Sequence, residues 1–241
     1  MTSRGAVRHW STALVLAACL LLLSVAVGLA WSPLAGLDRE VSAHAFAATY
    51  GHHERITVWT AVTDWGGPWP MRLAVASVGV ILLIRRRAVL GLWLVVLAAV
   101  EGVVAPASKY VLDRPRPSWP DPIAVTASAS YPSGHATAVA TTAVALAILA
   151  RRTAVTWACL VAAVTVAASR VFLGAHYLSD VVGGLLLGAL LAVSTHAVAT
   201  WRARPHVDPA SSESPSITTT PAFSSRRTSP VVPSGLVTST S

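Results

Sequence analysis

The sequence predicts an all-α protein built as a bundle of six transmembrane helices. Of its 241 residues, 54% are hydrophobic and 12% are charged, whereas a soluble domain carries about 25% charged residues. Apolar runs close to the length that crosses a bilayer recur along the chain, and arginines stand at alternate ends of them. We therefore attribute the net charge of +8 to orientation in the membrane and expect no nucleic-acid partner.

The first transmembrane helix is predicted over residues 11–31, which carry no charge. Residues 1–10 before it form a predicted short cytoplasmic N-terminus. A cleaved signal peptide is the alternative, but the apolar run is long for one, and no clear small-x-small cleavage site follows it. Residues 32–67 are mixed in character and predict an outer loop with a short interfacial helix. This loop ends in Gly66-Gly67-Pro68, a turn into the second span.

Five more spans are predicted, some of them short enough to need tilt or shifted boundaries. They cover 69–84, 88–106, 135–150, 153–169 and 178–200, and a polar loop over 107–133 separates the third span from the fourth.

Arginines at alternate span ends fix the predicted topology. The positive-inside rule assigns them to the cytoplasm, so both termini lie inside. Residues 201–241, rich in Ser, Thr and Pro without apolar periodicity, are predicted to be a disordered cytoplasmic tail. The orienting residues are Arg4, Arg8, Arg85, Arg86, Arg87, Arg151, Arg152, Arg202 and Arg204.

Four cations contradict this topology because they fall on the outer side. Lys109, Arg114 and Arg116 follow the third span, and Arg170 ends the fifth. Cations placed against the orientation rule need another explanation, and an anionic ligand held at the outer surface is the simplest one.

Two histidines lie beside these cations in the sequence. His135 opens the fourth span after Pro132-Ser133-Gly134, an approach that leaves free N–H groups at a helix N-terminus, where anions bind. His176 precedes the sixth span, with Asp180 four residues later on the same helix face. A carboxylate on one ring nitrogen of His176 fixes the tautomer and leaves the other nitrogen free to attack.

This set of residues is suited to phosphoryl transfer, which requires positioning and charge neutralisation. We expect His176 to act as the nucleophile and His135 as the general acid and base. Lys109, Arg116 and Arg170 would neutralise the phosphate, with the Ser133 hydroxyl and the Gly134 N–H as neutral donors. No acidic cluster accompanies these residues, so neither a metal site nor another cofactor is predicted.

At this point the sequence resembles a known family, the type-2 phosphatidic acid phosphatase superfamily, which also contains the vanadium-dependent haloperoxidases. Its three-part signature is K-x6-R-P, P-S-G-H and S-R-x5-H-x3-D, and it is matched in order by Lys109 to Pro117, Pro132 to His135 and Ser169 to Asp180. The resemblance covers about residues 55–200. It implies a membrane domain there, the roles given above, and an active site at the outer membrane face that works without a metal.

The resemblance implies a phosphatase that hydrolyses a phosphomonoester or diphosphate of a membrane lipid. We favour undecaprenyl or another polyprenyl diphosphate, because recycling of a carrier lipid needs an outward-facing phosphatase. Phosphatidic acid, phosphatidylglycerol phosphate and a prenyl-linked sugar phosphate stay open. So do a lipid phosphotransferase and a non-catalytic lipid-binding membrane protein, whereas the spans disfavour a haloperoxidase. The absence of Asn and Gln suggests a bacterial plasma membrane.

Three further features have simpler interpretations. Arg114 could contact either the phosphate or the headgroup zone. Glu101 lies two turns from Lys109, about 12 Å deeper at about 1.5 Å per residue, so a structural or cavity-lining role is expected. His52-His53-Glu54 are interpreted as solvated loop residues and not as metal ligands.

Overall fold

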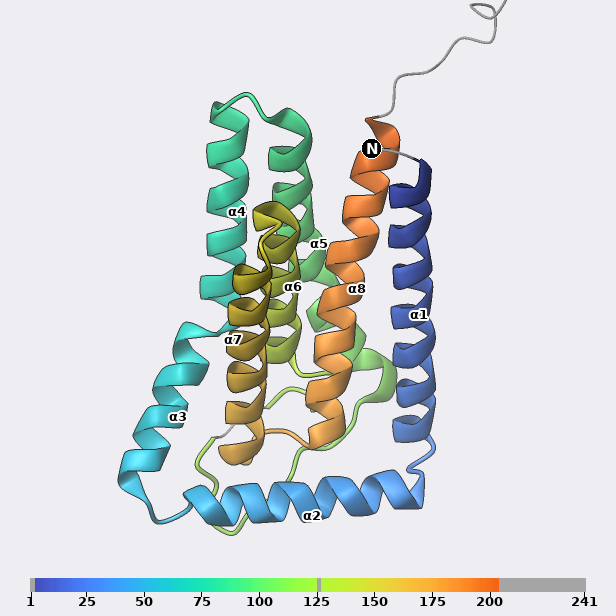
Figure 1. The fold of residues 1–241 in the computed structure, drawn as a ribbon. Coiled ribbons are helices and arrows are strands. Elements are labelled where there is room, and N and C mark those ends of the chain that lie inside the picture. The colour runs from blue at the N-terminus through green and yellow to red at the C-terminus, as the bar shows by residue number, and fades with distance from the viewer. Residues whose placement is uncertain (1–2, 125–126, 204–241) are drawn as a thin grey trace, which may run out of the picture. The chain divides into compact units, whose positions relative to one another are not determined.

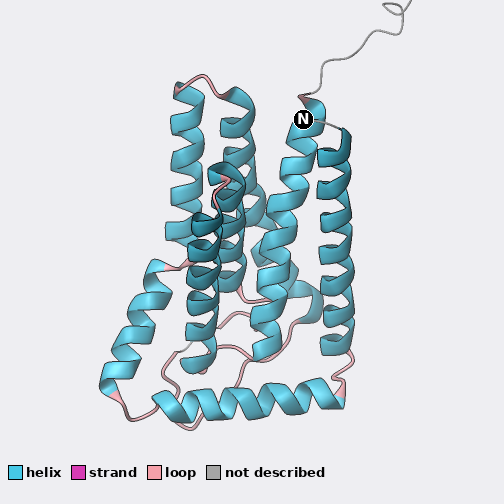
Figure 2. Ribbon diagram, in the orientation of Figure 1, coloured by secondary structure: helices cyan, strands magenta, loops and turns pink. Residues whose placement is uncertain are grey.

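Across residues 3–124 and 127–203, which the computed structural model describes, all regular structure is helical (Figure 2). The predicted disordered tail lies outside these residues except for its first three positions, and the predicted N-terminus is helical from Ser3 onward. The helices are α1 (Ser3–Gly28), α2 (Ser32–Thr49), α3 (His53–Trp65), α4 (Pro68–Ile84), α5 (Ala88–Leu112), α6 (Gly134–Ala150), α7 (Thr153–Phe172) and α8 (Leu178–Arg202).

Five helical segments are long and apolar enough to cross a membrane. The remaining predicted span, the fourth, corresponds to α6, which is apolar but has only 17 residues, a length of about 25 Å. Large apolar side chains such as Leu22, Leu73 and Trp157 are exposed on the outer faces of the bundle, as contact with lipid requires. The five segments are His9–Gly28, His53–Ile84, Ala88–Leu112, Thr153–Phe172 and Leu178–Arg202.

The segment predicted as a loop with a short helix contains more helix than expected. Residues 32–67 form α2, with 18 residues, and α3, with 13 residues. Figure 1 shows α2 lying across one end of the bundle, beneath the ends of α7 and α8. Its buried face consists of Asp38, Ser42, Phe46 and Thr49. Because three of these four side chains are polar, an apolar periodicity could not reveal this helix.

The third predicted span also continues further than expected. α5 passes through Pro106, which removes one backbone hydrogen bond without ending the helix. The helix ends at Leu112, where Asp113 adopts a left-handed conformation with φ 42°. Lys109 therefore lies on the last turn of a helix and not in a loop.

Close packing of α6 on α8 fixes the geometry at the end that α2 crosses. A Cβ atom on Gly184 would lie 2.4 Å from the Ser133 carbonyl oxygen, and one on Gly188 would lie 2.2 Å from that of Thr137. Only glycine permits this approach, as in other small-residue contacts between membrane helices. The approach allows the Ser133 N–H to donate to the Asp180 carbonyl at 2.9 Å.

Candidate active site

Four helix ends meet at the end of the bundle that α2 crosses, namely the C-termini of α5 and α7 and the N-termini of α6 and α8 (Figure 1). The residues proposed from the sequence lie on these ends or in the adjoining loops, so the structure brings all of them together. They are Lys109, Arg116, Ser133, Gly134, His135, Arg170, His176 and Asp180.

His176 is buried in a tight turn between α7 and α8, with 2% of its surface exposed. The Arg170 carbonyl accepts the N–H groups of Ala175 at 3.0 Å and His176 at 3.2 Å. Gly174 makes the turn possible with φ +69°, a conformation that favours glycine. Trp119 donates its Nε1–H to the Gly174 carbonyl at 2.9 Å and packs where a Cβ atom would stand. The turn that carries His176 is thus held by backbone hydrogen bonds and by Trp119.

Asp180 approaches the imidazole as the spacing of four predicted. Its Oδ2 lies 3.5 Å from His176 Nδ1. The Ser130 hydroxyl lies 3.3 Å from the same nitrogen and donates to the same oxygen, so it bridges the two groups. The Tyr177 N–H also donates to Oδ2, at 2.9 Å. Sequence reasoning missed Ser130, because a serine in a polar loop carries no signal of its own.

The other ring nitrogen of His176 shows which tautomer is present. Arg116 Nη1 lies 3.1 Å from Nε2, and a guanidinium can only donate. Nε2 therefore accepts, and the ring proton is on Nδ1, facing Asp180 and Ser130. Burial lowers the pKa of His176 to about 4, although the contact with Asp180 acts in the opposite direction. The imidazole is neutral at pH 7, with the lone pair on Nε2.

Three cations of the candidate site, Lys109, Arg116 and Arg170, form no salt bridge with a carboxylate among the described residues. Lys109 Nζ donates to the Ala129 carbonyl at 2.6 Å. Arg116 donates from Nε to the Ser128 carbonyl at 2.7 Å, and burial lowers its pKa. Arg170 Nη1 donates to the Thr63 hydroxyl at 2.8 Å. Neutral acceptors hold all three side chains, so their charge is available to an anion.

Neutral donors lie beside these cations at the start of α6. Ser133 Oγ, at the start of α6, is buried and has no hydrogen-bond partner among the described residues. The same holds for Nε of the cation Arg170 on α7. The space next to Gly134 is open, since a Cβ atom there would meet nothing within 4 Å. His135 follows and interacts electrostatically with Arg170 and His176. A helix N-terminus with free donors and adjacent cations is suited to binding a phosphate.

Arg114 contacts carboxylates, which neither of its two expected roles anticipated. Its terminal nitrogens lie 2.8 Å from Asp38 Oδ2 and 2.6 Å from Asp180 Oδ1. Glu101 forms a buried ion pair with Arg72 of α4 and lines a small cavity of about 10 Å³, as a structural or cavity-lining role predicted.

The tract His52-His53-Glu54 is exposed, but the interpretation as a loop was wrong for two of its residues, because His53 and Glu54 begin α3. Over the described part of the chain, no group of three or more His, Cys, Asp and Glu side chains is arranged to hold a metal ion.

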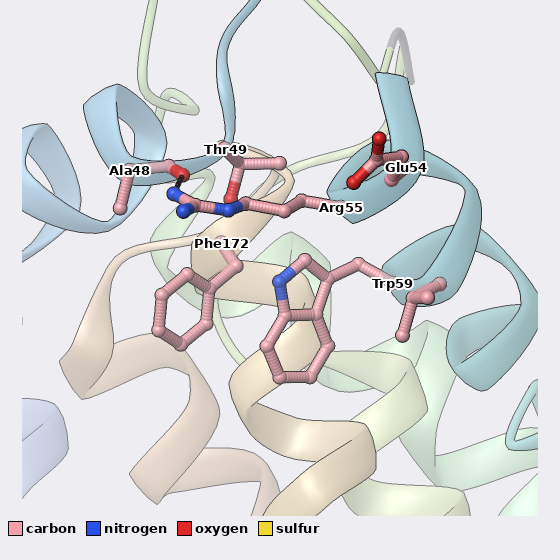
Figure 3. A pocket seen from close by; sticks show the side chains of 7 residues that line it. Ala48, Thr49, Glu54, Arg55, Trp59 and Phe172 are labelled. Atoms are coloured by element: carbon pink, nitrogen blue, oxygen red, sulfur yellow. Dashed lines mark hydrogen bonds between the residues drawn. The ribbon is translucent and has the colours of Figure 1, made fainter. Parts of the chain in front are cut away.

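A cavity of about 500 Å³ opens between α2, α3 and α7 (Figure 3). The rings of Trp59 and Phe172 stack there with centroids 4.7 Å apart, and Arg55 reaches across them to donate to the Ala48 carbonyl. None of the residues proposed for catalysis lines this cavity. Phe172 and Arg170 share the last turn of α7, so the cavity borders the helix end that carries Arg170.

Comparisons with known proteins agree with this architecture. Residues 90–207 match the model of the PAP2 superfamily. The undecaprenyl-diphosphatase of Sulfolobus acidocaldarius is 34% identical over 117 residues, covering 45% of this chain and 55% of the relative. The chain thus matches about half the length of that curated relative.

Among solved structures, a crystal structure of a transmembrane PAP2-type phosphatidylglycerolphosphate phosphatase from Bacillus subtilis superposes with a TM-score of 0.70. The match covers 81% of this chain and 98% of that one at 24% identity. This likeness establishes the fold, an all-α multi-pass membrane protein.

Proposed function

Because the chain belongs to the PAP2 superfamily, we propose that it is a metal-independent lipid-phosphate phosphatase that forms a phosphohistidine on His176. The observation that carries this proposal is the state of His176. Its imidazole is neutral, its Nδ1–H faces a carboxylate, and its Nε2 accepts from Arg116, one of three cations that form no salt bridge among the described residues. A nucleophile oriented by a third group has this arrangement.

In the first step, His176 Nε2 attacks phosphorus and the bond to the leaving oxygen breaks. His135 enters this step as the imidazolium, gives its proton to the leaving alkoxide or phosphate and becomes neutral. As the ring becomes cationic, Asp180 Oδ2 stabilises the positive charge through Nδ1–H and the Ser130 hydroxyl.

In the second step, a water molecule attacks the phosphohistidine and gives its proton to His135. The P–N bond breaks, inorganic phosphate leaves and the neutral imidazole returns. A lipid alcohol in place of water would make the same intermediate the centre of a phosphotransferase.

Charge neutralisation comes from the groups around Nε2. Lys109, Arg116 and Arg170 exchange their present neutral acceptors for the phosphate oxygens. The buried Ser133 hydroxyl and the Gly134 N–H add donors at the α6 N-terminus. Donors aimed at developing charge in a water-poor site are the main source of rate enhancement in phosphoryl transfer.

A lipid is the substrate that this site favours. We place an acyl or prenyl chain in the largely apolar cavity beside Trp59 and Phe172, which borders the end of α7 that carries Arg170. The named relatives act on undecaprenyl diphosphate and phosphatidylglycerolphosphate, both of which are lipid phosphates. We favour a polyprenyl diphosphate, following the more similar sequence.

The proposed orientation follows from the orienting arginines. Residues 85–87 and 151–152 connect helices at the end of the bundle opposite α2 (Figure 1). The positive-inside rule assigns that end to the cytoplasm. The site then faces outward from a bacterial plasma membrane, where it meets the headgroups of the outer leaflet.

The test is phosphate release by the purified protein in detergent with EDTA, across a panel of lipid phosphates and diphosphates. His176→Ala should abolish release, and His44→Ala, a change at an exposed histidine on α2, should not. Release that EDTA removes, or that survives His176→Ala, contradicts the proposal. Phosphate that appears on a second lipid, and not in solution, identifies a phosphotransferase.

A further inference from the structure

Arg114 and Arg116 are two residues apart, yet their partners differ in kind. Arg116 donates to carbonyl oxygens and to His176 Nε2. Arg114 Nη1 donates to Asp180 Oδ1 at 2.6 Å, and its Nη2 donates to Asp38 Oδ2 at 2.8 Å. Its guanidinium also lies 4.4 Å from the centre of the Tyr177 ring. The contacts of Arg114 are therefore with the rear of the orienting carboxylate and not with the nucleophile.

Asp38 ties α2 to this network from a distant part of the chain. Asp38 lies on α2, is 1% exposed and forms a salt bridge with Arg114. Its Oδ1 accepts the Ser179 N–H at 2.8 Å, and its Oδ2 also accepts the Ser179 hydroxyl. Asp38 thus holds the first turn of α8 directly, beside Asp180.

The two oxygens of Asp180 have separate partners. Oδ2 faces His176 Nδ1, Ser130 and the Tyr177 N–H, whereas Oδ1 binds Arg114. A carboxylate held on both oxygens cannot rotate about its Cβ–Cγ bond, so the oxygen that faces the imidazole is fixed.

We infer that Arg114 and Asp38 are positioning residues, which lock Asp180 and through it the His176 tautomer, and that α2 is thereby a part of the active site. This inference rests on the proposed function, because it concerns the orientation of the proposed nucleophile.

The charge state of Arg114 agrees with this role. Burial alone would lower its pKa, but Asp180 and Asp38 raise the pKa above its ordinary value. To bind a phosphate, Arg114 would have to break its salt bridges with Asp38 and Asp180, and Asp180 is completely buried. Breaking such a buried pair is strongly unfavourable, so Arg114 stays with them when a phosphate binds nearby.

The experiment compares Arg114→Lys and Asp38→Asn with two changes at exposed neighbours on α2, Arg39→Lys and Glu40→Gln. Phosphate release gives kcat, and product inhibition by inorganic phosphate reports anion binding. Lysine keeps the charge but cannot span both carboxylates. We expect kcat to fall about 100-fold for Arg114→Lys, the loss that a misplacement of about 1 Å causes, and about 10-fold for Asp38→Asn. Phosphate inhibition should stay within about twofold of wild type in both, and the controls should behave as wild type.

Two readouts separate positioning from a merely structural contribution. The double variant should have the kcat of Arg114→Lys alone, because both changes break one chain of contacts. Arg114→Gln should move the acid limb of kcat/KM to higher pH. Without that cation, Asp180 favours the imidazolium of His176 more strongly, while Arg116 and Arg170 still oppose it. A structural defect would lower activity without moving the limb.

Each outcome decides the inference. Wild-type kcat in Arg114→Lys or Asp38→Asn overturns it, and so does weakened phosphate inhibition, which would make Arg114 a clamp.

If Arg114→Lys does not fold, Ser179→Ala decides, because it removes the hydroxyl between Arg114 and Asp38 but leaves every charge. Lower kcat at unchanged phosphate inhibition then supports the inference, and wild-type kcat overturns it. Activity that survives His176→Ala would instead sink the proposed function.

Discussion

The molecule buries charge in two regions that differ in their balance. Between α4 and α5, Arg72 meets Glu101, and the two charges cancel. At the end that α2 crosses, Arg114 forms salt bridges with carboxylates, whereas among the described residues Lys109, Arg116 and Arg170 form none and donate to carbonyl and hydroxyl oxygens.

The difference separates structural charge from functional charge. A buried charge is costly to desolvate unless a partner compensates it. The α4–α5 pair is complete in itself, so it needs no ligand. The cation cluster is incomplete without an anion, and this imbalance, more than the presence of charge, marks the site. The predictions below separate the two regions.

The largest expected effect is on catalysis at the unbalanced end. Arg116→Gln should lower kcat/KM for phosphate release about 1000-fold, because it removes the cation nearest to the attacking nitrogen. The protein should fold as wild type, since the lost hydrogen bonds are to carbonyls, the Ser128 hydroxyl and His176 Nε2, all within the site. Steady-state kinetics beside a thermal unfolding curve measures both. Near-normal kcat/KM in this variant would show that the cluster does not bind the reacting phosphate.

The balanced region should respond in the opposite way. Arg72→Gln leaves Glu101 buried without its partner, which costs about 3–5 kcal/mol of stability. Its kcat at a temperature where the protein is folded should match wild type. Replacing both residues together, as Arg72→Met with Glu101→Leu, should restore much of the unfolding midpoint. A large fall in kcat without loss of stability would assign this pair to the site.

A smaller loss is expected from Lys109→Ala, because this side chain contributes a single point charge. Phosphate release should fall about 100-fold on every lipid in the panel. Inorganic phosphate should inhibit this variant more weakly than it inhibits wild type. Loss on one lipid alone would make Lys109 a headgroup selector.

The smallest effect concerns pH. Since burial lowers the pKa of His176 to about 4, the free enzyme keeps a neutral nucleophile through weakly acidic pH. The acid limb of kcat/KM should therefore fall nearer to pH 4 than to the ordinary value of about 6.5. Two substrates whose phosphates ionise at different pH should share this limb. A limb near pH 6.5 for both would contradict the buried, neutral imidazole.

The same lowered pKa has a consequence for stability. The unfolded chain binds a proton on His176 at about pH 6.5, well before the folded protein does. The folded state therefore loses stability as the pH falls from about 6.5 toward 4. Above about pH 6.5, His176 is neutral in both states and causes no such loss of stability.

Much of the fold could be predicted from the sequence because lipid imposes strong rules on composition. Apolar runs and arginine clusters located the spans, although α5 continued past Pro106 and α6 proved short. The clustering of the candidate site residues was predictable for a similar reason, since cations predicted on the outer side stand out against the orientation rule.

The remaining features depend on contacts between distant segments, which the sequence does not specify. α2 has a polar buried face, and Asp38 meets Ser179 across 141 positions of the chain. Ser130 and Gly174 owe their importance to what the fold brings beside them, an imidazole in one case and Trp119 in the other. Arg114 could not be told from Arg116 by motif alone, because only the structure shows which one faces carboxylates.

The central claim is that His176 carries the phosphoryl group, and a rapid-quench trap of the phosphoenzyme tests it most directly. A lipid diphosphate has a good leaving group, so His135→Ala should still form the intermediate while its hydrolysis, which needs the base, slows. Peptide mass spectrometry after an alkaline quench should then find phosphate on His176, and His135→Ala combined with His176→Ala should carry none. Turnover in wild type with phosphate on another residue, or in the double variant, would contradict the account.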